Sequence, residues 1–126
     1  MQNDYVIVAH LPCIALIKES MMNVIFHLNQ LERFDHCYAN IKNLRTESIG
    51  IVELLINGDA IQLLIRDDVS KITDLLNHGT KISACANSLR AHGIDSSILP
   101  QGVVVVPTGV FELIKKQNEG FSYIKP

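Results

Sequence analysis

The chain has 126 residues, a length that fits one domain, and 48% of them are hydrophobic, so it can bury a core. The formal net charge is only −2, with acidic and basic residues mixed along the chain, which excludes a basic surface for nucleic acid or an anionic membrane. The three cysteines, Cys13, Cys37 and Cys85, form no CxxC pair and no His/Cys spacing of the zinc type. We therefore expect no metal site and no disulfide framework, and this scattered set favours the reducing cytoplasm.

Residues 1–21 are predicted to be an N-terminal extension, and residues 22–126 to be the folded domain. The extension contains a broken apolar run, from Tyr5 to Ile17, which is too short to span a bilayer. It also lacks the positively charged start and the small-residue cleavage site of a secretory signal. Met21 or Met22 could be an alternative start, because the first predicted strand follows directly.

The first half of the domain predicts two strands, each followed by a helix. Residues 23–28 form a short apolar run that is typical of a buried strand. Asn29 is then expected to cap an amphipathic helix, because Glu32 stands three residues later as in a capping box. Residues 48–56 form the second apolar run, which ends at the turn signal Asn57-Gly58. A short helix is expected after this turn.

The second half repeats the alternation and ends in a strand. A helix is expected to begin with Asp68 or Ser70 as its cap and to end at Gly79. Residues 81–84 predict a third strand, which passes at Cys85 into a short helix. The remaining predicted elements are a strand at residues 103–106, a helix at residues 110–117 and a partly exposed strand at residues 121–126.

Alternating strands and helices predict a parallel sheet that is covered by helices on both faces. In such sheets, ligands bind beyond the carboxyl ends of the strands. Polar, reactive and glycine residues gather at four predicted strand ends, whereas the strand interiors are apolar. These candidate site residues are His27, Asn57 with Gly58, Cys85 with Asn87, and Thr108 with Gly109.

Cys85 is the residue that most suggests chemistry, because it stands where a strand passes into a helix. The first N–H groups of a helix are unpaired and carry partial positive charge, which favours a thiolate. The simpler interpretation is an inert core cysteine. His27 could tune or deprotonate a ligand thiol, or be a structural histidine. Asn87 and Thr108 could form hydrogen bonds around the sulfur.

The glycines at the strand ends have two interpretations. Gly58 and Gly109 would let the backbone approach a ligand closely. The segments Asn57-Gly58 and Pro107-Thr-Gly109 are explained more simply by turn formation and capping.

Six sequence segments together are similar to those of a known protein family. They are Val24-Ile-Phe-His-Leu28, Asn40-Ile-Lys-Asn43, Cys85-Ala-Asn-Ser-Leu-Arg-Ala-His-Gly-Ile94, Leu99-Pro100, Val106-Pro-Thr-Gly-Val110 and Gln117-Asn-Glu-Gly-Phe-Ser-Tyr-Ile-Lys-Pro126. With them the chain resembles the DsrE/DsrF-like family of small sulfur-relay proteins over roughly residues 22–126. The resemblance implies a three-layer α/β/α sandwich with a mostly parallel five-stranded sheet. It also implies assembly as a homotrimer or homohexamer, and a cysteine persulfide at the position that matches Cys85.

The sequence therefore suggests a cytoplasmic sulfur-relay protein that carries sulfur as a persulfide on Cys85. Its expected partners are sulfur-donor and sulfur-acceptor proteins or a small sulfur compound, with no cofactor, no nucleic acid and no membrane. Two alternatives stay open. The first is a non-catalytic oligomeric module that binds a small ligand at the strand ends, and the second is a thiol redox sensor of the same fold.

Overall fold

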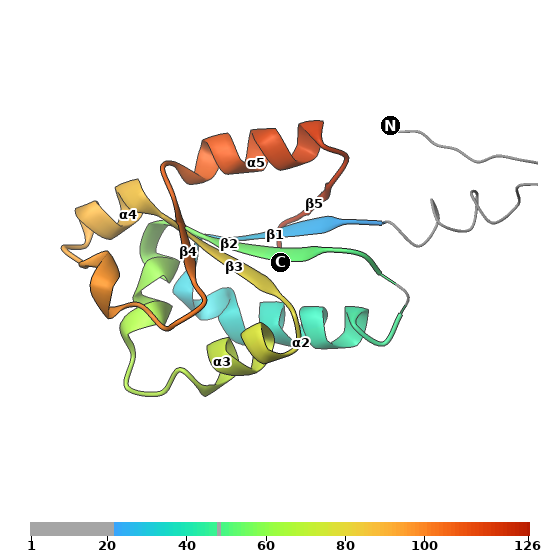
Figure 1. Cartoon of the computed structure of the whole chain (residues 1–126). Helices are drawn as coiled ribbons and strands as arrows, with labels where there is room; N and C mark the ends of the chain where they lie inside the picture. The colour runs from blue at the N-terminus through green and yellow to red at the C-terminus, as the bar shows by residue number, and fades with distance from the viewer. Residues whose placement is uncertain (1–21, 48) are drawn as a thin grey trace, which may run out of the picture.

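A five-stranded parallel sheet forms the centre of the protein. The computed structural model describes residues 22–47 and 49–126, so the predicted extension at residues 1–21 lies outside the described residues. The strands are ordered β4-β3-β2-β1-β5, and all neighbouring pairs are parallel (Figure 1). Their bounds are β1 Val24–Leu28, β2 Val52–Ile56, β3 Lys81–Cys85, β4 Val104–Val106 and β5 Ser122–Ile124.

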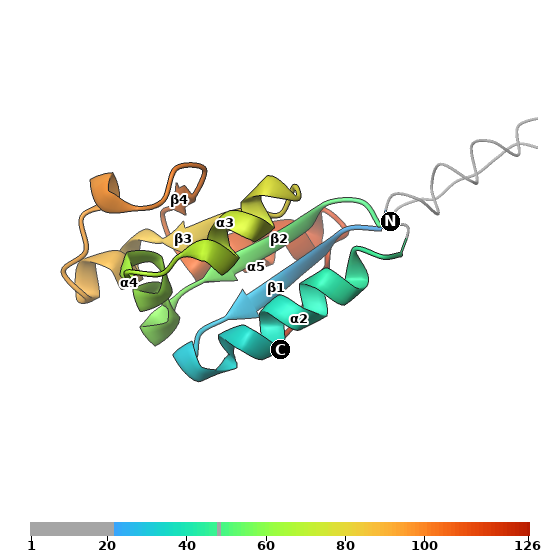
Figure 2. The ribbon, with the colours of Figure 1, turned by 90° about the horizontal axis from the view of Figure 1, so that it is seen from below.

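Helices cover both faces of this sheet. Figures 1 and 2 show α2 and α3 on one face and α5 on the other, which confirms the predicted three-layer α/β/α sandwich. The short helix α4 follows β3 at one end of the sheet. The α-helices are α2 Phe34–Leu44, α3 Ser70–Asn77, α4 Ala86–Ala91 and α5 Gly109–Asn118, and the 3-10 helices are η1 Leu31–Arg33, η2 Gly58–Ile65 and η3 Ser96–Ile98.

Side-chain alternation along the strands divides the interior into two cores of unequal size. In β2, Leu54 packs into the larger core, whereas its neighbour Leu55 belongs to the smaller one. The larger core includes side chains of α2, η2, α3 and α4. The smaller core contains five buried residues, of which Leu113 is the one contributed by α5. The face under α5 is therefore poor in apolar contacts.

Two local predictions differ from the structure. Asn29 does not cap a helix, because the chain first forms the 3-10 turn η1 after the extended residue Gln30. The Oδ1 atom of Asn29 instead accepts a hydrogen bond from Nζ of Lys125, at 2.9 Å. The second strand begins at Val52, not at residue 48, and just before it the N–H of Ile51 donates to the Oδ1 atom of Asn23.

The third predicted helix is present, but its expected cap is wrong at one end and right at the other. Helix α3 begins at Ser70 after the N-cap residue Val69, and no side chain caps it; Oδ1 of Asp68 instead accepts a hydrogen bond from the N–H of Ser70 at 2.9 Å. Gly79 follows this helix with a φ of +90°, a conformation that glycine adopts easily, as predicted for the end of the helix.

No helix among the described residues is long and apolar enough to cross a membrane. Within the same residues, no group of three or more His, Cys, Asp or Glu side chains could hold a metal ion.

Candidate functional site

Cys85 is the last residue of β3 and the residue that precedes α4. Its partner in the sheet register is Val106 of β4, and both belong to the face that α5 covers. Four groups form hydrogen bonds with the Cys85 sulfur: the hydroxyl of Ser88 and the backbone N–H groups of Asn87, Ser88 and Gly109. Two of these N–H groups open α4 and the third opens α5, so two helix starts meet at one sulfur atom.

These contacts favour the thiolate of Cys85. Burial by itself raises the pKa of this thiol, but the hydrogen bonds from Ser88, Gly109 and Asn87 outweigh burial and hold the pKa below its ordinary value. Cys37 is the contrast, because burial raises the pKa of that thiol to about 12. Cys85 retains 5% exposure, whereas Cys37 has none. Of the two described cysteines, Cys85 is therefore the one whose thiol has a lowered pKa and some exposed surface.

Gly58 acts on the sulfur through Ser88. The backbone N–H of Gly58 donates to Oγ of Ser88 at 2.9 Å, so the hydroxyl hydrogen of Ser88 remains free to donate to the sulfur. Gly58 adopts a φ of +57°, and a Cβ atom there would lie 3.1 Å from the carbonyl oxygen of Asn29. The positive φ and the lack of room for a Cβ atom explain why this strand end carries glycine.

His27 belongs to a separate group of hydrogen-bonded side chains, Asn57–His27–Tyr123, which also lies at the carboxyl ends of the strands. Its Nε2 atom lies 3.0 Å from Oδ1 of Asn57, and its Nδ1 atom lies 2.7 Å from the hydroxyl of Tyr123. An amide oxygen accepts, so Nε2 carries the hydrogen and Nδ1 accepts from Tyr123. Burial lowers the pKa of His27, the charge of Lys125 lowers it further, and the bond to Asn57 partly offsets both. His27 is thus held neutral, and its described hydrogen bonds do not reach Cys85.

Asn57, which bonds His27, also lies beside Gly109 at the start of α5. A Cβ atom on Gly109 would lie 3.1 Å from Nδ2 of Asn57 and 3.3 Å from Cδ2 of Leu55. Gly109 therefore lets the first turn of α5 approach β2 closely. Thr108 precedes α5 with an extended backbone, and its side chain does not cap the helix. Asn87 offers the sulfur its N–H, while its exposed side chain accepts a hydrogen bond from Arg90.

The Gly109→Ala variant tests this close approach. The added methyl group must displace Asn57 or the start of α5, so we expect a loss of about 1–3 kcal/mol of unfolding free energy and a slower alkylation of Cys85. Urea unfolding and iodoacetamide kinetics measure the two effects. Lys115→Ala is the control, because Lys115 is exposed on the same helix. Wild-type alkylation rates in a folded Gly109→Ala protein would contradict the expected role.

The sequence prediction did not include Ser88 and Tyr123. Ser88 stands three residues after Cys85, so counting from a strand-to-helix junction at Cys85 could have placed its hydroxyl near the sulfur. Tyr123 is separated from His27 by 96 residues, and only the pairing of β1 with β5 brings them together. The sequence carries no local signal for that contact.

Fold and site together define a small α/β protein with a strand-end thiol held by two helix starts. The chain belongs to the DsrE/DsrF-like family, which it matches over residues 36–126. No curated protein matches the chain significantly. The family assignment agrees with the resemblance seen in the sequence.

Several solved structures are similar to this fold, among them the following three. A protein of unknown function from Methanobacterium thermoautotrophicum is 31% identical, with 83% of this chain and 99% of that chain covered and a TM-score of 0.78. The ychN protein from E. coli is 17% identical over 84% of this chain and 100% of that chain, with a TM-score of 0.70. A conserved protein of unknown function from Bacteroides thetaiotaomicron is 16% identical over 82% and 94% of the two chains, with a TM-score of 0.69.

Proposed function

We propose that this protein is a sulfur-relay protein that accepts sulfur on Cys85, holds it as a persulfide and passes it to another thiol. One observation carries the proposal. The Cys85 sulfur accepts hydrogen bonds from the N–H groups of Asn87, Ser88 and Gly109, which belong to the starts of two helices. Such groups stabilise a thiolate, and they also suit the anion of a persulfide.

The transfer step conserves electrons. The Cys85 thiolate attacks the outer sulfur of a donor persulfide, so a new bond forms between Sγ and that sulfur. The bond between the two donor sulfurs breaks, and the donor leaves as a thiolate with the electron pair. The second transfer repeats the same exchange, with Cys85 as the leaving thiolate. A low thiol pKa helps Cys85 in both steps, because it supplies the thiolate and makes Cys85 a good leaving group.

The surroundings of Cys85 support transfer to another molecule over an internal disulfide. Cys37 is the other described cysteine, and it is buried in the large core on the opposite face of the sheet. A persulfide on Cys85 therefore has no described thiol beside it that could release the sulfur. The proposed partners are a sulfur donor and a sulfur acceptor, either proteins or a small sulfur compound, in the cytoplasm.

Loading with glutathione persulfide tests the proposal. Wild-type protein should gain the mass of one sulfur atom on the peptide that contains Cys85, and Cys85→Ser should gain none there. Equal gains in both proteins, or none in the wild type, would overturn the proposal. Hydrogen peroxide serves as the comparison reagent: fast formation of a sulfenate without persulfide loading would favour the redox sensor.

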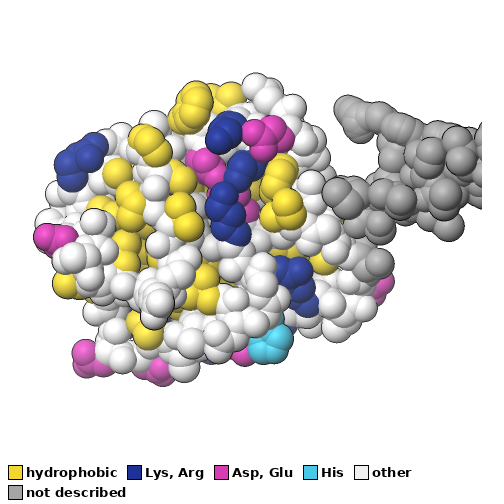
Figure 3. Space-filling view, in the orientation of Figure 1, with side chains coloured by type: hydrophobic (Ala, Val, Ile, Leu, Met, Phe, Trp, Pro, Cys, Tyr) yellow, Lys and Arg dark blue, Asp and Glu magenta, His cyan; other side chains and the backbone are white. Residues whose placement is uncertain are grey.

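We also propose that the protein associates with copies of itself through the outer face of α5. Val110, Phe111 and Ile114 lie on one side of this helix, and they are 63%, 59% and 52% exposed. Val104 of the edge strand β4 is exposed on the same side of the sheet. Figure 3, in which α5 lies along the top of the molecule, shows hydrophobic side chains on the visible side, with Lys and Arg side chains between them. Large exposed apolar surfaces of this kind mark interfaces, and a closed ring of copies would cover them.

A double variant tests this interface. Phe111→Glu with Ile114→Glu places two charges in the proposed contact, so we expect it to sediment as a monomer at micromolar concentration while the wild type sediments as a trimer or hexamer. Lys115→Glu is the matched control, because Lys115 is exposed on the same helix. A monomeric wild type, or a double variant with the wild-type mass, would contradict the proposal.

A further inference from the structure

Helix α5 contacts the sheet with few apolar side chains. Its buried residues are Gly109, Glu112, Leu113 and Lys116, which form one stripe along the helix. Leu113 is the only large apolar side chain among them. A helix with one such anchor gains little from apolar burial, so its place on the sheet depends on the other two side chains of the stripe.

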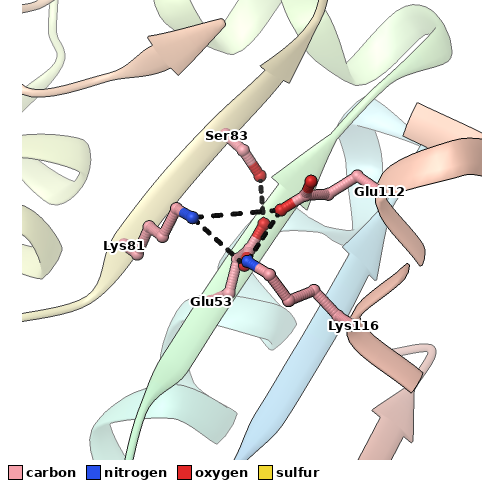
Figure 4. Close-up of polar contacts among 5 residues, drawn as sticks. All are labelled: Glu53, Lys81, Ser83, Glu112 and Lys116. Atoms are coloured by element: carbon pink, nitrogen blue, oxygen red, sulfur yellow. Dashed lines mark hydrogen bonds and ion pairs between the residues drawn. The ribbon is translucent and has the colours of Figure 1, made fainter. Parts of the chain in front are cut away.

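Those two side chains join a buried ionic cluster, defined here as Glu53, Lys81, Ser83, Glu112 and Lys116 (Figure 4). The Nζ atom of Lys116 donates to Oε1 of Glu53 at 2.7 Å and to Oε2 of Glu112 at 2.9 Å. The other oxygen of Glu53 accepts a hydrogen bond from Oγ of Ser83, also at 2.7 Å. The ammonium group of Lys81 lies 3.8 Å from Glu53 and 3.9 Å from Glu112. The cluster thus ties α5 to β2 and β3.

The cluster contains two carboxylates and two ammonium groups, and all of these side chains except that of Lys81 are buried or nearly so. Glu53 has no exposed surface, and the side chain of Lys116 is 10% exposed. Burial by itself lowers the pKa of Lys116, but the hydrogen bonds to Glu53 and Glu112 outweigh it and raise the pKa, so the ammonium keeps its charge. Each ion of a buried pair needs its partner, because an unpaired charge in the interior is costly.

The two ends of the same stripe touch different parts of the molecule. At one end, the N–H of Gly109 donates to the Cys85 sulfur. At the other end, Lys116 is anchored on Glu53, seven residues and about 10 Å farther along a rigid helix. A shift of the anchored end therefore moves the N–H that faces the sulfur.

We infer that the Glu53–Lys116–Glu112 contacts are a positioning device for Cys85, which hold α5 where the N–H of Gly109 reaches the sulfur. The cluster residues act through α5 and touch no reacting atom. The inference rests on the proposed function only in that the thiolate of Cys85 is the form that transfers sulfur.

The test compares the pH dependence of Cys85 alkylation in the full-length wild type and in Lys116→Met, which keeps most of the side-chain length without the charge. Peptide mass mapping after iodoacetamide treatment separates Cys85 from Cys13 and Cys37. We expect the midpoint of the Lys116→Met profile to move to higher pH. The rate at neutral pH should fall about tenfold, the factor for losing one hydrogen bond to a charged group. Lys115→Met is the matched control, because Lys115 is exposed one residue earlier, and it should keep the wild-type profile.

A second variant covers the case in which Lys116→Met does not fold. Glu53→Gln with Lys116→Met removes one charge of each sign and also breaks the anchor, so it should show the same shift. The amide proton of Gly109, followed by NMR through the pH titration, should report the ionisation of Cys85 in the wild type and lose that response in the variants. A wild-type profile in either folded variant would overturn the inference. No sulfur donor enters these measurements, so a failure of persulfide loading would leave them interpretable.

Discussion

Cys85 is expected to be alkylated faster at neutral pH than an ordinary thiol, with the midpoint of its pH profile at lower pH. The physical reason is that hydrogen bonds from Ser88, Gly109 and Asn87 hold the pKa of Cys85 below its ordinary value. The Ser88→Ala variant removes the hydroxyl donor. We expect its Cys85 to react about tenfold more slowly at neutral pH, because a hydrogen bond to a charged group is worth about 1.5–3 kcal/mol. A small alkylating reagent and peptide mass mapping measure both rates.

The controls for this prediction come from the same chain. Ser96→Ala removes an exposed hydroxyl from η3 and should leave the rate unchanged. Cys37 should stay unmodified in the folded protein, because burial raises the pKa of that thiol to about 12. A Cys85 rate that keeps rising with pH as a free thiol does would contradict the account.

The same lowered pKa affects stability. Because the pKa of Cys85 is lower in the folded chain than in the unfolded chain, its ionisation stabilises the fold above the ordinary thiol pKa. This contribution is lost as the pH falls through the lowered pKa. Urea unfolding of wild type and Cys85→Ala across this range should show a gap that closes toward acid.

Lys116→Met is expected to destabilise the protein by about 3 kcal/mol, because it leaves the buried carboxylate of Glu53 without its main partner. Lys81 remains 3.8 Å from Glu53 and cannot replace a 2.7 Å hydrogen bond without moving. The expected loss is large for a domain of this size. Urea unfolding measures it.

The charge-balanced double variant distinguishes two costs of the Lys116→Met change: the loss of the Lys116–Glu53 attraction, and the burial of the Glu53 carboxylate without a partner. Glu53→Gln with Lys116→Met leaves no unpaired carboxylate at β2, and the amide oxygen that replaces the carboxylate can still accept the hydrogen bond from Ser83. We expect it to regain more than half of the stability that Lys116→Met loses. Equal stabilities of the single and double variants would show that Glu53 is not an uncompensated charge in the single variant.

The fold could be predicted from the sequence because its signals are local. Apolar runs, helical spacing and turn glycines such as Gly79 act within a few residues, and they defined the alternation of strands and helices. The placement of Cys85 at a strand end followed from the same signals. Parallel strands then bring their carboxyl ends to one edge, which is why His27, Asn57 and Cys85 come from different segments but share that edge.

The contacts that refine the site depend on distant residues. Glu53 interrupted an otherwise apolar run, and its partner Lys116 is 63 residues away. Asn29 is a residue type that often caps helices, yet its side chain accepts a hydrogen bond from Lys125 at the other end of the domain. Tyr123 reaches His27 only through strand pairing. Such contacts require the register of the sheet, which no single segment contains.

The most direct test of the central claim is the fate of a labelled sulfur atom. Protein loaded on Cys85 with radioactive sulfane sulfur is mixed with a second thiol, either the monothiol glutathione or an acceptor protein. We expect the label to move to the acceptor as a persulfide, and Cys85 to return as a free thiol that can be loaded again. Retention of the label on Cys85, or its absence from Cys85 after loading, would contradict the role of this protein as a sulfur carrier.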